Sequence, residues 1–163
     1  MGHIVETVGV EGIDRVEPLW RAMVEHHRAV VGHEVPVRAT DVTWPLRRVQ
    51  YEDWIGRGDG VLLLAVTAPG AEPDGYACVR TSAGGGPTFA LGERVGELES
   101  LAVAEHARGA GVGSLLIAAA RERMRELGVS HWLVSVVDAN AGAVRFYERE
   151  GFRPFERILL STV

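Results

Sequence analysis

The chain has 163 residues, a formal net charge of −5 and one cysteine. This length fits one domain, residues 1–163, and a composition of 47% apolar and 24% charged residues is that of a globular protein rather than a disordered one. The sequence has no apolar run of membrane-spanning length, no signal-peptide pattern and no cluster of Lys or Arg, so we expect a cytoplasmic protein that binds neither a membrane nor nucleic acid.

The first half of the chain predicts one strand, two helices and then a pair of strands. Weak alternation favours a strand over residues 3–8, and apolar residues at helical spacing predict a helix over 14–31. A second helix, with a threonine at its N-cap, is expected over 43–54. Two apolar runs, 60–67 and 75–81, flank a turn rich in Pro and Gly, so we expect them to pair antiparallel.

The second half predicts three strands that alternate with two helices, over residues 94–103, 109–127, 131–137, 140–151 and 152–161. The last helix is expected to be capped by Asn140 and ended by Gly151. The first strand–helix–strand spacing fits a right-handed crossover between parallel strands. The element order therefore predicts an α+β fold, in which a mixed, mainly antiparallel sheet is flanked by about four helices.

The lone cysteine, Cys78, lies within the strand-like stretch Tyr76 to Arg80. A single thiol excludes an internal disulfide and leaves too few ligands for a structural zinc site, and the six histidines show no ligand spacing. We therefore expect no metal, and we expect Cys78 to be a small buried side chain rather than a nucleophile.

A glycine-rich turn follows the strand over 94–103 and opens the next helix; its residues are Arg108, Gly109, Ala110, Gly111, Val112, Gly113 and Ser114. Backbone N–H groups at a helix N-terminus have no partner within the helix and lie at the positive end of its dipole. Glycines let the backbone approach an anion closely, and an arginine adds positive charge at the rim. The turn is therefore expected to bind a pyrophosphate.

Two other glycine-rich motifs fit this turn less well. A dinucleotide-binding fold would place its first glycine directly after the strand, but residues 104–108 intervene here, and the position of its third glycine is occupied by Ser114. A P-loop would require a lysine followed by Ser or Thr, which the turn lacks.

The Arg-x-x-Gly-x-Gly pattern after a strand resembles the acyl-CoA signature of the Gcn5-related N-acetyltransferase superfamily. A second block, residues 140–152, resembles the other recurrent motif of that family. The two blocks span roughly the C-terminal third of the chain. The resemblance implies direct acetyl transfer from acetyl-CoA to an amine, with acetyl-CoA bound by residues of about 95–155. It also implies a splayed central pair of parallel strands, with backbone groups near Leu101 and Val103 bonded to the pantetheine arm.

Three side chains are expected to move protons in such a reaction. Glu97 and Glu99 are the candidate bases for the amine, with ordered water as an alternative, and two-residue alternation puts both on one side of their strand unless a bulge intervenes. Asn140 and Tyr147 share one face of the short helix, where the resemblance places them beside the cofactor. Tyr147 is expected to protonate the departing thiolate.

The acceptor is expected to be a primary amine on a small or amino-acid-like molecule, bound by the N-terminal half of the chain. A protein lysine or protein N-terminus is the alternative acceptor, and a non-catalytic acyl-CoA sensor is a third possibility, against which the two glutamates and Tyr147 argue. His26, Trp20 and Trp44 are the candidate acceptor contacts, although the helical spacing of Trp20 favours packing in the core.

The sequence departs from the family pattern in two places. Glu105 stands where a proline is common, and only about a dozen residues follow Gly151. The second departure leaves room for one final strand instead of a hairpin, so completion of the sheet by a partner chain, and hence a homodimer, is an open expectation.

Overall fold

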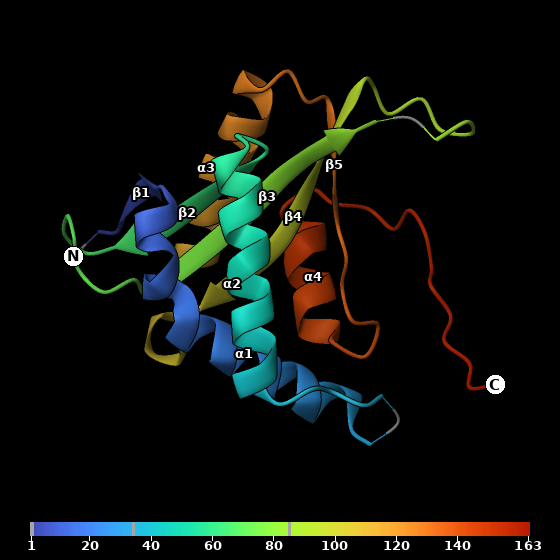
Figure 1. Ribbon diagram of the computed structural model, residues 1–163, viewed down its shortest axis with the longest axis horizontal. Helices are drawn as coiled ribbons and strands as arrows, with labels where there is room; N and C mark the ends of the chain where they lie inside the picture. Colours follow the sequence, from blue (N-terminus) through green and yellow to red (C-terminus); the bar gives the residue numbers. More distant parts are fainter. Residues whose placement is uncertain (1, 34, 85) are drawn as a thin grey trace.

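The structure is a computed structural model that describes residues 2–33, 35–84 and 86–163. These residues form a five-stranded sheet in the order β1 to β5, with helices on both faces (Figure 1). The strands are β1 (Ile4–Val8), β2 (Gly60–Val66), β3 (Gly75–Ala83), β4 (Arg94–Val103) and β5 (His131–Val134). Each neighbouring pair is antiparallel except β4 and β5, which are parallel. The mixed, mainly antiparallel sheet with a parallel pair is the predicted fold class.

The helices cover the two faces of the sheet unequally. They are α1 (Glu17–Val31), α2 (Thr40–Gly56), α3 (Val112–Glu126) and α4 (Ala141–Arg149), with short 3₁₀ turns η1 (Val10–Val16) and η2 (Glu105–Ala107). The helices α1 and α2 lie on one face, and α3 lies behind the sheet on the other (Figure 1). The aromatic side chains of α4 pack against the α3 core.

Successive side chains of the central strands point alternately into two separate cores. Leu62 and Leu64 of β2 pack with η1, α1 and α2, whereas Leu63 and Ala65 pack with α3. Because both faces are covered, the strand is an almost unbroken apolar run instead of an alternation of apolar and polar residues. The same burial encloses Cys78 and raises the pKa of its thiol, so this side chain is confirmed as a buried apolar group.

Several predicted boundaries are correct and several shift. The strand over 94–103 has the predicted bounds, and Asn140 caps α4 by accepting a hydrogen bond from the backbone of Ala143 at 3.1 Å. The second helix begins at Thr40, so the predicted cap at Thr43 is wrong. The first helix also begins later than predicted, since a 3₁₀ turn occupies its first residues. The strand predicted to reach residue 137 ends at Val134.

The prediction of a final strand over 152–161 is wrong. In the described structure these residues have no regular secondary structure, and Ile158, Leu159 and Leu160 are 89%, 86% and 75% exposed. The segment begins against the sheet, where the ring of Phe152 lies 4.8 Å from that of Trp132, and then runs away from it (Figure 1). Strand-forming side chains are not sufficient without a backbone partner, because a strand is stabilised by its pairing. Thus β5 is the end strand of the described sheet.

Candidate functional site

The glycine-rich turn presents its backbone to open space. Gly109 and Gly111 have φ of +76° and +82°, a left-handed conformation that L side chains rarely adopt. An added Cβ at either position would meet no atom within 4 Å, and residues 108–111 are exposed. Since Gly111 is the N-cap of α3, the helix begins at Val112, three residues later than predicted, and its first N–H groups face the exposed turn. The turn therefore has the backbone geometry of an anion-binding site.

Two residues of the predicted turn serve packing instead. Val112 is buried in the α3 core. A Cβ on Gly113 would lie 3.1 Å from the ring of Phe146, so this glycine lets α4 pack against the start of α3. Ser114 is exposed and donates a hydrogen bond to Glu150, and Arg108 reaches back to the carbonyl oxygen of Val103 at 3.4 Å.

The second half of β4 has an open edge. Its pairing with β5 ends at Leu98 and Val134, whereas its pairing with β3 continues to Val103. Among the residues that the structure describes, β4 therefore has no partner in β5 from Glu99 onward. This stretch includes Leu101 and Val103. Peptide groups along that edge are available to the amides of an extended ligand.

A β-bulge at Glu99 marks the place where β5 departs. Cys78 opposes Ser100 and Val79 opposes Leu98, which leaves Glu99 as the additional residue of β4. Leu98 packs in the α3 core, whereas Ser100 turns to the opposite face and accepts a hydrogen bond from Tyr51 of α2 at 2.7 Å. The bulge thus turns two consecutive side chains, those of Glu99 and Ser100, toward α2.

Two arginines hold the candidate bases on this face. Arg80 of β3 donates Nη2 to Glu97 at 2.6 Å and Nε to Glu99, and Arg47 of α2 donates Nη1 to Glu99 at 3.3 Å. Both glutamates therefore lie on one side of β4, as predicted. Burial, reinforced by the charge of Glu99, raises the pKa of Glu97 above its ordinary value. The pair combines a carboxylate held by two guanidiniums, Glu99, with one whose pKa is raised above its ordinary value, Glu97.

Sequence reasoning missed both arginines. Arg80 stands directly opposite Glu97 in the register of β3 with β4, and register is invisible without the strand pairing. Arg47 had a detectable signal, because Arg47, Tyr51 and Trp54 recur at spacings of four and three residues and so share one face of α2.

Aromatic side chains surround Arg47. Its guanidinium carbon lies 4.8 Å from the ring centroid of Trp20 and 5.6 Å from those of Tyr51 and Trp54. Trp20 is 7% exposed, so it offers a ring face to Arg47 while most of its surface packs in the core. Trp44 is 5% exposed and belongs to the same core. The burial of both tryptophans favours packing as their main role.

Tyr147 lies on α4, and Asn140 is the residue that caps this helix. Burial against Phe146 and Phe152 raises the pKa of the Tyr147 phenol to about 12. Nδ2 of Asn140 lies 3.4 Å from Nε2 of the exposed His26, so α1 meets the start of α4 at these two predicted residues. Within the described residues no hydrogen bond joins Tyr147 to either glutamate.

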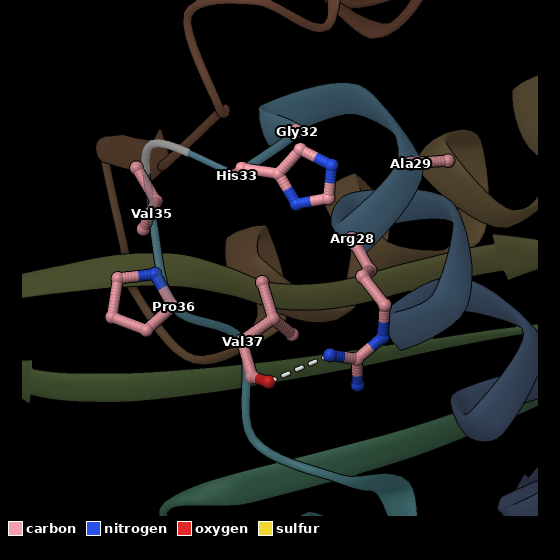
Figure 2. A pocket seen from close by; sticks show the side chains of 7 residues that line it. All are labelled: Arg28, Ala29, Gly32, His33, Val35, Pro36 and Val37. Carbon is pink, nitrogen blue, oxygen red and sulfur yellow. Dashed lines mark hydrogen bonds between the residues drawn. The ribbon is translucent and has the colours of Figure 1, made fainter.

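Two cavities lie beside the C-terminal ends of α2 and α1. A cleft of about 410 Å³ adjoins the arginine–glutamate cluster and is lined by Trp54, Arg57, Asp59, Arg80, Thr81, Ser82, Ala83, Glu93 and Arg94. A second cavity, of about 460 Å³, lies at the end of α1 and is lined by Arg28, Ala29, Gly32, His33, Val35, Pro36 and Val37. Figure 2 shows Arg28 reaching across it to the carbonyl oxygen of Val37, at 2.7 Å.

The sequence pattern of the acetyltransferase (GNAT) family matches residues 21–152. The chain belongs to the acetyltransferase (GNAT) family. Members of this family are acyltransferases that use acetyl-CoA as a co-substrate. In the described part of the chain, no group of three or more His, Cys, Asp or Glu is placed to hold a metal ion, and no helix has the length and apolar character needed to cross a membrane.

Solved structures of other GNAT-like proteins share the fold. A GCN5-related N-acetyltransferase from Ralstonia eutropha is 15% identical, with 99% of each chain covered and a TM-score of 0.77. A ribosomal-protein-alanine N-acetyltransferase from Brucella melitensis is 13% identical, with 99% of this chain and all of the other covered and a TM-score of 0.67. An aminoglycoside acetyltransferase from an uncultured soil metagenomic sample is 13% identical, covers 99% and 95%, and has a TM-score of 0.68. No curated protein matches the chain.

The open turn and the open edge of β4 are suited to two adjacent parts of the GNAT co-substrate, its pyrophosphate and its amide-bearing arm. The exposed backbone over 108–111 suits a pyrophosphate, and the unpaired edge near Leu101 and Val103 suits an arm that carries amide groups.

A valine at Gly111 tests the turn. We expect Gly111→Val to weaken acetyl-CoA binding by more than about tenfold, because the left-handed backbone at this position costs an L side chain about 1–2 kcal/mol and the turn must rearrange to avoid it. Calorimetric titration with acetyl-CoA measures the affinity. Gly58→Val is the matched control, since Gly58 has φ of +77° and equally open surroundings at the end of α2. Equal affinity in both variants would contradict the phosphate-binding role of the turn.

Proposed function

We propose that this protein transfers an acetyl group from acetyl-CoA to the primary amine of a small or amino-acid-like molecule. The observation that carries the proposal is the pair Glu97 and Glu99, which lie on one face of β4 where β5 departs from it. This arrangement supports proton removal from an amine beside an edge that can hold a thioester.

Residues at the two ends of the open edge would hold acetyl-CoA. The pyrophosphate would lie on the backbone of 108–111, with Arg108 and Ser114 at its rim, and the pantetheine amides would pair with β4 at Leu101 and Val103. Asn140 would lie beside the same arm at the start of α4. When bound, acetyl-CoA supplies the activated thioester, and the side chains of this protein position the amine and move its protons.

Glu97 is the better base of the two glutamates. An alkyl ammonium has a pKa near about 10, so a base must remove a proton before the nitrogen can form the new C–N bond. Among the described residues, Glu99 accepts from both arginines, which gives it a positioning role, whereas Glu97 accepts from Arg80 alone and has a raised pKa. Glu97 would take the amine proton directly or through water.

Tyr147 would supply the proton that the departing thiolate needs. Its pKa of about 12 keeps the phenol protonated throughout the neutral range, and the C–S bond breaks as the thiolate accepts that proton. The presence of both a base and an acid favours an enzyme over an acyl-CoA sensor. A protein lysine or N-terminus is the alternative acceptor, but the half-buried glutamate pair favours a small molecule over a protein surface.

Replacement of Glu97 should change the pH profile. A base acts in its deprotonated form, so activity should rise with pH through the pKa of Glu97, which burial places above the ordinary carboxyl value. This rise of activity with pH is the acidic limb of the profile. We expect Glu97→Gln to lower kcat about 10²- to 10⁴-fold and to abolish the acidic limb. The measurement is kcat/KM against pH with one reactive amine.

Two further variants serve as comparisons. Glu99→Gln should lower activity and shift the limb to lower pH without abolishing it, because the charge of Glu99 helps to raise the pKa of Glu97. Glu122→Gln, at an exposed position of α3, should leave the profile unchanged. An acidic limb that persists in Glu97→Gln would assign the base to another group or to water.

Replacement of Tyr147 should separate catalysis from binding. Tyr147→Phe keeps the packing against Phe146 and Phe152 but removes the hydroxyl group. We expect kcat to fall about 10²- to 10⁴-fold while the acetyl-CoA affinity stays within about twofold, because only the proton donor is lost. Steady-state kinetics and titration calorimetry measure the two quantities. An unchanged kcat would show that water or another group protonates the thiolate.

The exposed segment after α4 supports a homodimer. It begins against the end strand β5, at the contact of Phe152 with Trp132, and then presents Ile158, Leu159 and Leu160 to solvent. A sheet edge with unpaired backbone groups and an unpaired apolar segment are complementary. We propose that residues 152–161 of one chain add as a strand beside β5 of a second copy, by a two-fold exchange.

The dimer is testable through this segment. We expect the purified protein to be dimeric and the double variant Ile158→Asp with Leu160→Asp to be monomeric, because charges at these positions disfavour the buried pairing. Light scattering coupled to size-exclusion chromatography gives the mass. Val49→Asp, at an exposed apolar position of α2, is the control and should remain dimeric. A monomeric parent protein would refute the exchange.

A further inference from the structure

Arg47 has the surroundings of a preorganised binding group. Three aromatic rings, those of Trp20, Tyr51 and Trp54, contact its guanidinium from α1 and α2. Contacts of this kind restrict where the planar group can lie, so it loses little conformational freedom when a ligand binds. The aromatic contacts therefore hold the group in place without consuming its hydrogen-bond donors.

Most donors of Arg47 remain unused by the protein. A guanidinium has five N–H donors in a fixed fork. Among the described residues, Glu99 is the one acceptor that Arg47 reaches, through Nη1 at 3.3 Å, whereas Arg80 donates to both glutamates. The side chain of Arg47 is 21% exposed, so it is partly desolvated but still accessible. A carboxylate, which accepts two parallel N–H bonds, matches such a group.

The position of Arg47 relates it to the proposed chemistry. Its partner Glu99 is the bulged residue where β4 loses β5, and Glu97 lies on the same face. The two arginines balance the charge of the two glutamates, so a zwitterionic acceptor would enter the cluster without adding net charge. Trp54 and Arg80 also line the cleft of about 410 Å³, which offers room for the rest of the acceptor.

Building on the proposed acetyl transfer, we infer that the acceptor is an amine that also carries a carboxylate, as an amino acid does, and that Arg47 binds this carboxylate while Glu97 faces the amine. Arg47 is then the specificity-determining residue of the acceptor site. The acetyl group forms an amide with the acceptor nitrogen, CoA leaves as the thiol, and the acceptor carboxylate stays unchanged throughout.

The test uses pairs of acceptors that differ only in the carboxylate: each common amino acid and the amine formed by its decarboxylation. In the parent protein, kcat/KM should be higher for the reactive amino acid than for its matching amine. Arg47→Met should raise the KM of the amino acid about tenfold to a hundredfold more than that of the amine, because both acceptors lose the contact of Arg47 with Glu99 but only the amino acid loses its carboxylate contact. Arg47→Lys, which keeps the charge but not the fork, should give an intermediate KM.

Arg48→Met is the matched control, because Arg48 is the next residue of α2 and pairs with Asp14 and Glu52, away from the cluster. It should leave the discrimination between the two acceptors unchanged. An equal loss with both acceptors in Arg47→Met and Arg47→Lys would overturn the inference and make Arg47 a structural partner of Glu99. Equal kcat/KM for amino acid and amine in the parent protein would overturn it as well.

A binding measurement separates this inference from the proposed function. Titration of the parent protein and of Arg47→Met with N-acetylated amino acids, compared with the N-acetylated amines, reports carboxylate recognition without turnover. Tighter binding of the N-acetylated amino acids that is lost in Arg47→Met supports the inference, and binding that does not distinguish the two sets overturns it. If acetyl-CoA binds but no acceptor is acetylated, the proposed function fails, whatever the titrations show about Arg47.

Discussion

The pairing of β4 changes along its length, and the candidate site depends on this change. Over the ranges that the structure describes, the strand has two neighbours from Val95 to Leu98 and, after the bulge at Glu99, pairs with β3 alone from Ser100 to Val103. A buried peptide group without a hydrogen-bond partner costs about 1–3 kcal/mol, so this edge favours a ligand with amide groups of its own. The bulge lies at the same point and turns Glu99 and Ser100 toward α2. One strand thereby provides both the edge of the proposed co-substrate site and the face of the proposed acceptor site.

The two faces of the sheet differ in polarity: one forms an apolar core, and the other carries polar groups beside the candidate site. The α3 face is almost wholly apolar, and α3 also presents the glycine turn at its first residue. The opposite face buries hydroxyl groups, with Tyr51 bonded to Ser100 and close to Tyr76, beside the glutamates. Buried polar groups of this kind are tolerated because they have partners, and their directional bonds fix the bulge more sharply than apolar packing would.

Electrostatic pairing sets the different characters of the two glutamates. In the part of the chain that is described, Glu99 has two guanidinium partners and is the less exposed carboxylate, while Glu97 has one such partner and a raised pKa. Breaking a half-buried charge pair leaves the other charge uncompensated. Because Arg80 pairs with both glutamates, a change at Arg80 alters the charge environment of both. The aromatic rings around Arg47 add a favourable contact that leaves its donors available.

The sequence by itself determined the features that depend on neighbouring residues. Left-handed glycines at positions 109 and 111, the cap formed by Asn140 and the bounds of the strand over 94–103 follow from local backbone preferences and periodicity. The tertiary structure alone decided the partnership of Arg80 and Arg47 with the glutamates, because strand register and helix docking bring together residues 17 and 52 positions apart. It also decided that residues 152–161 are not a strand, since pairing requires a second backbone that the sequence of one segment does not contain.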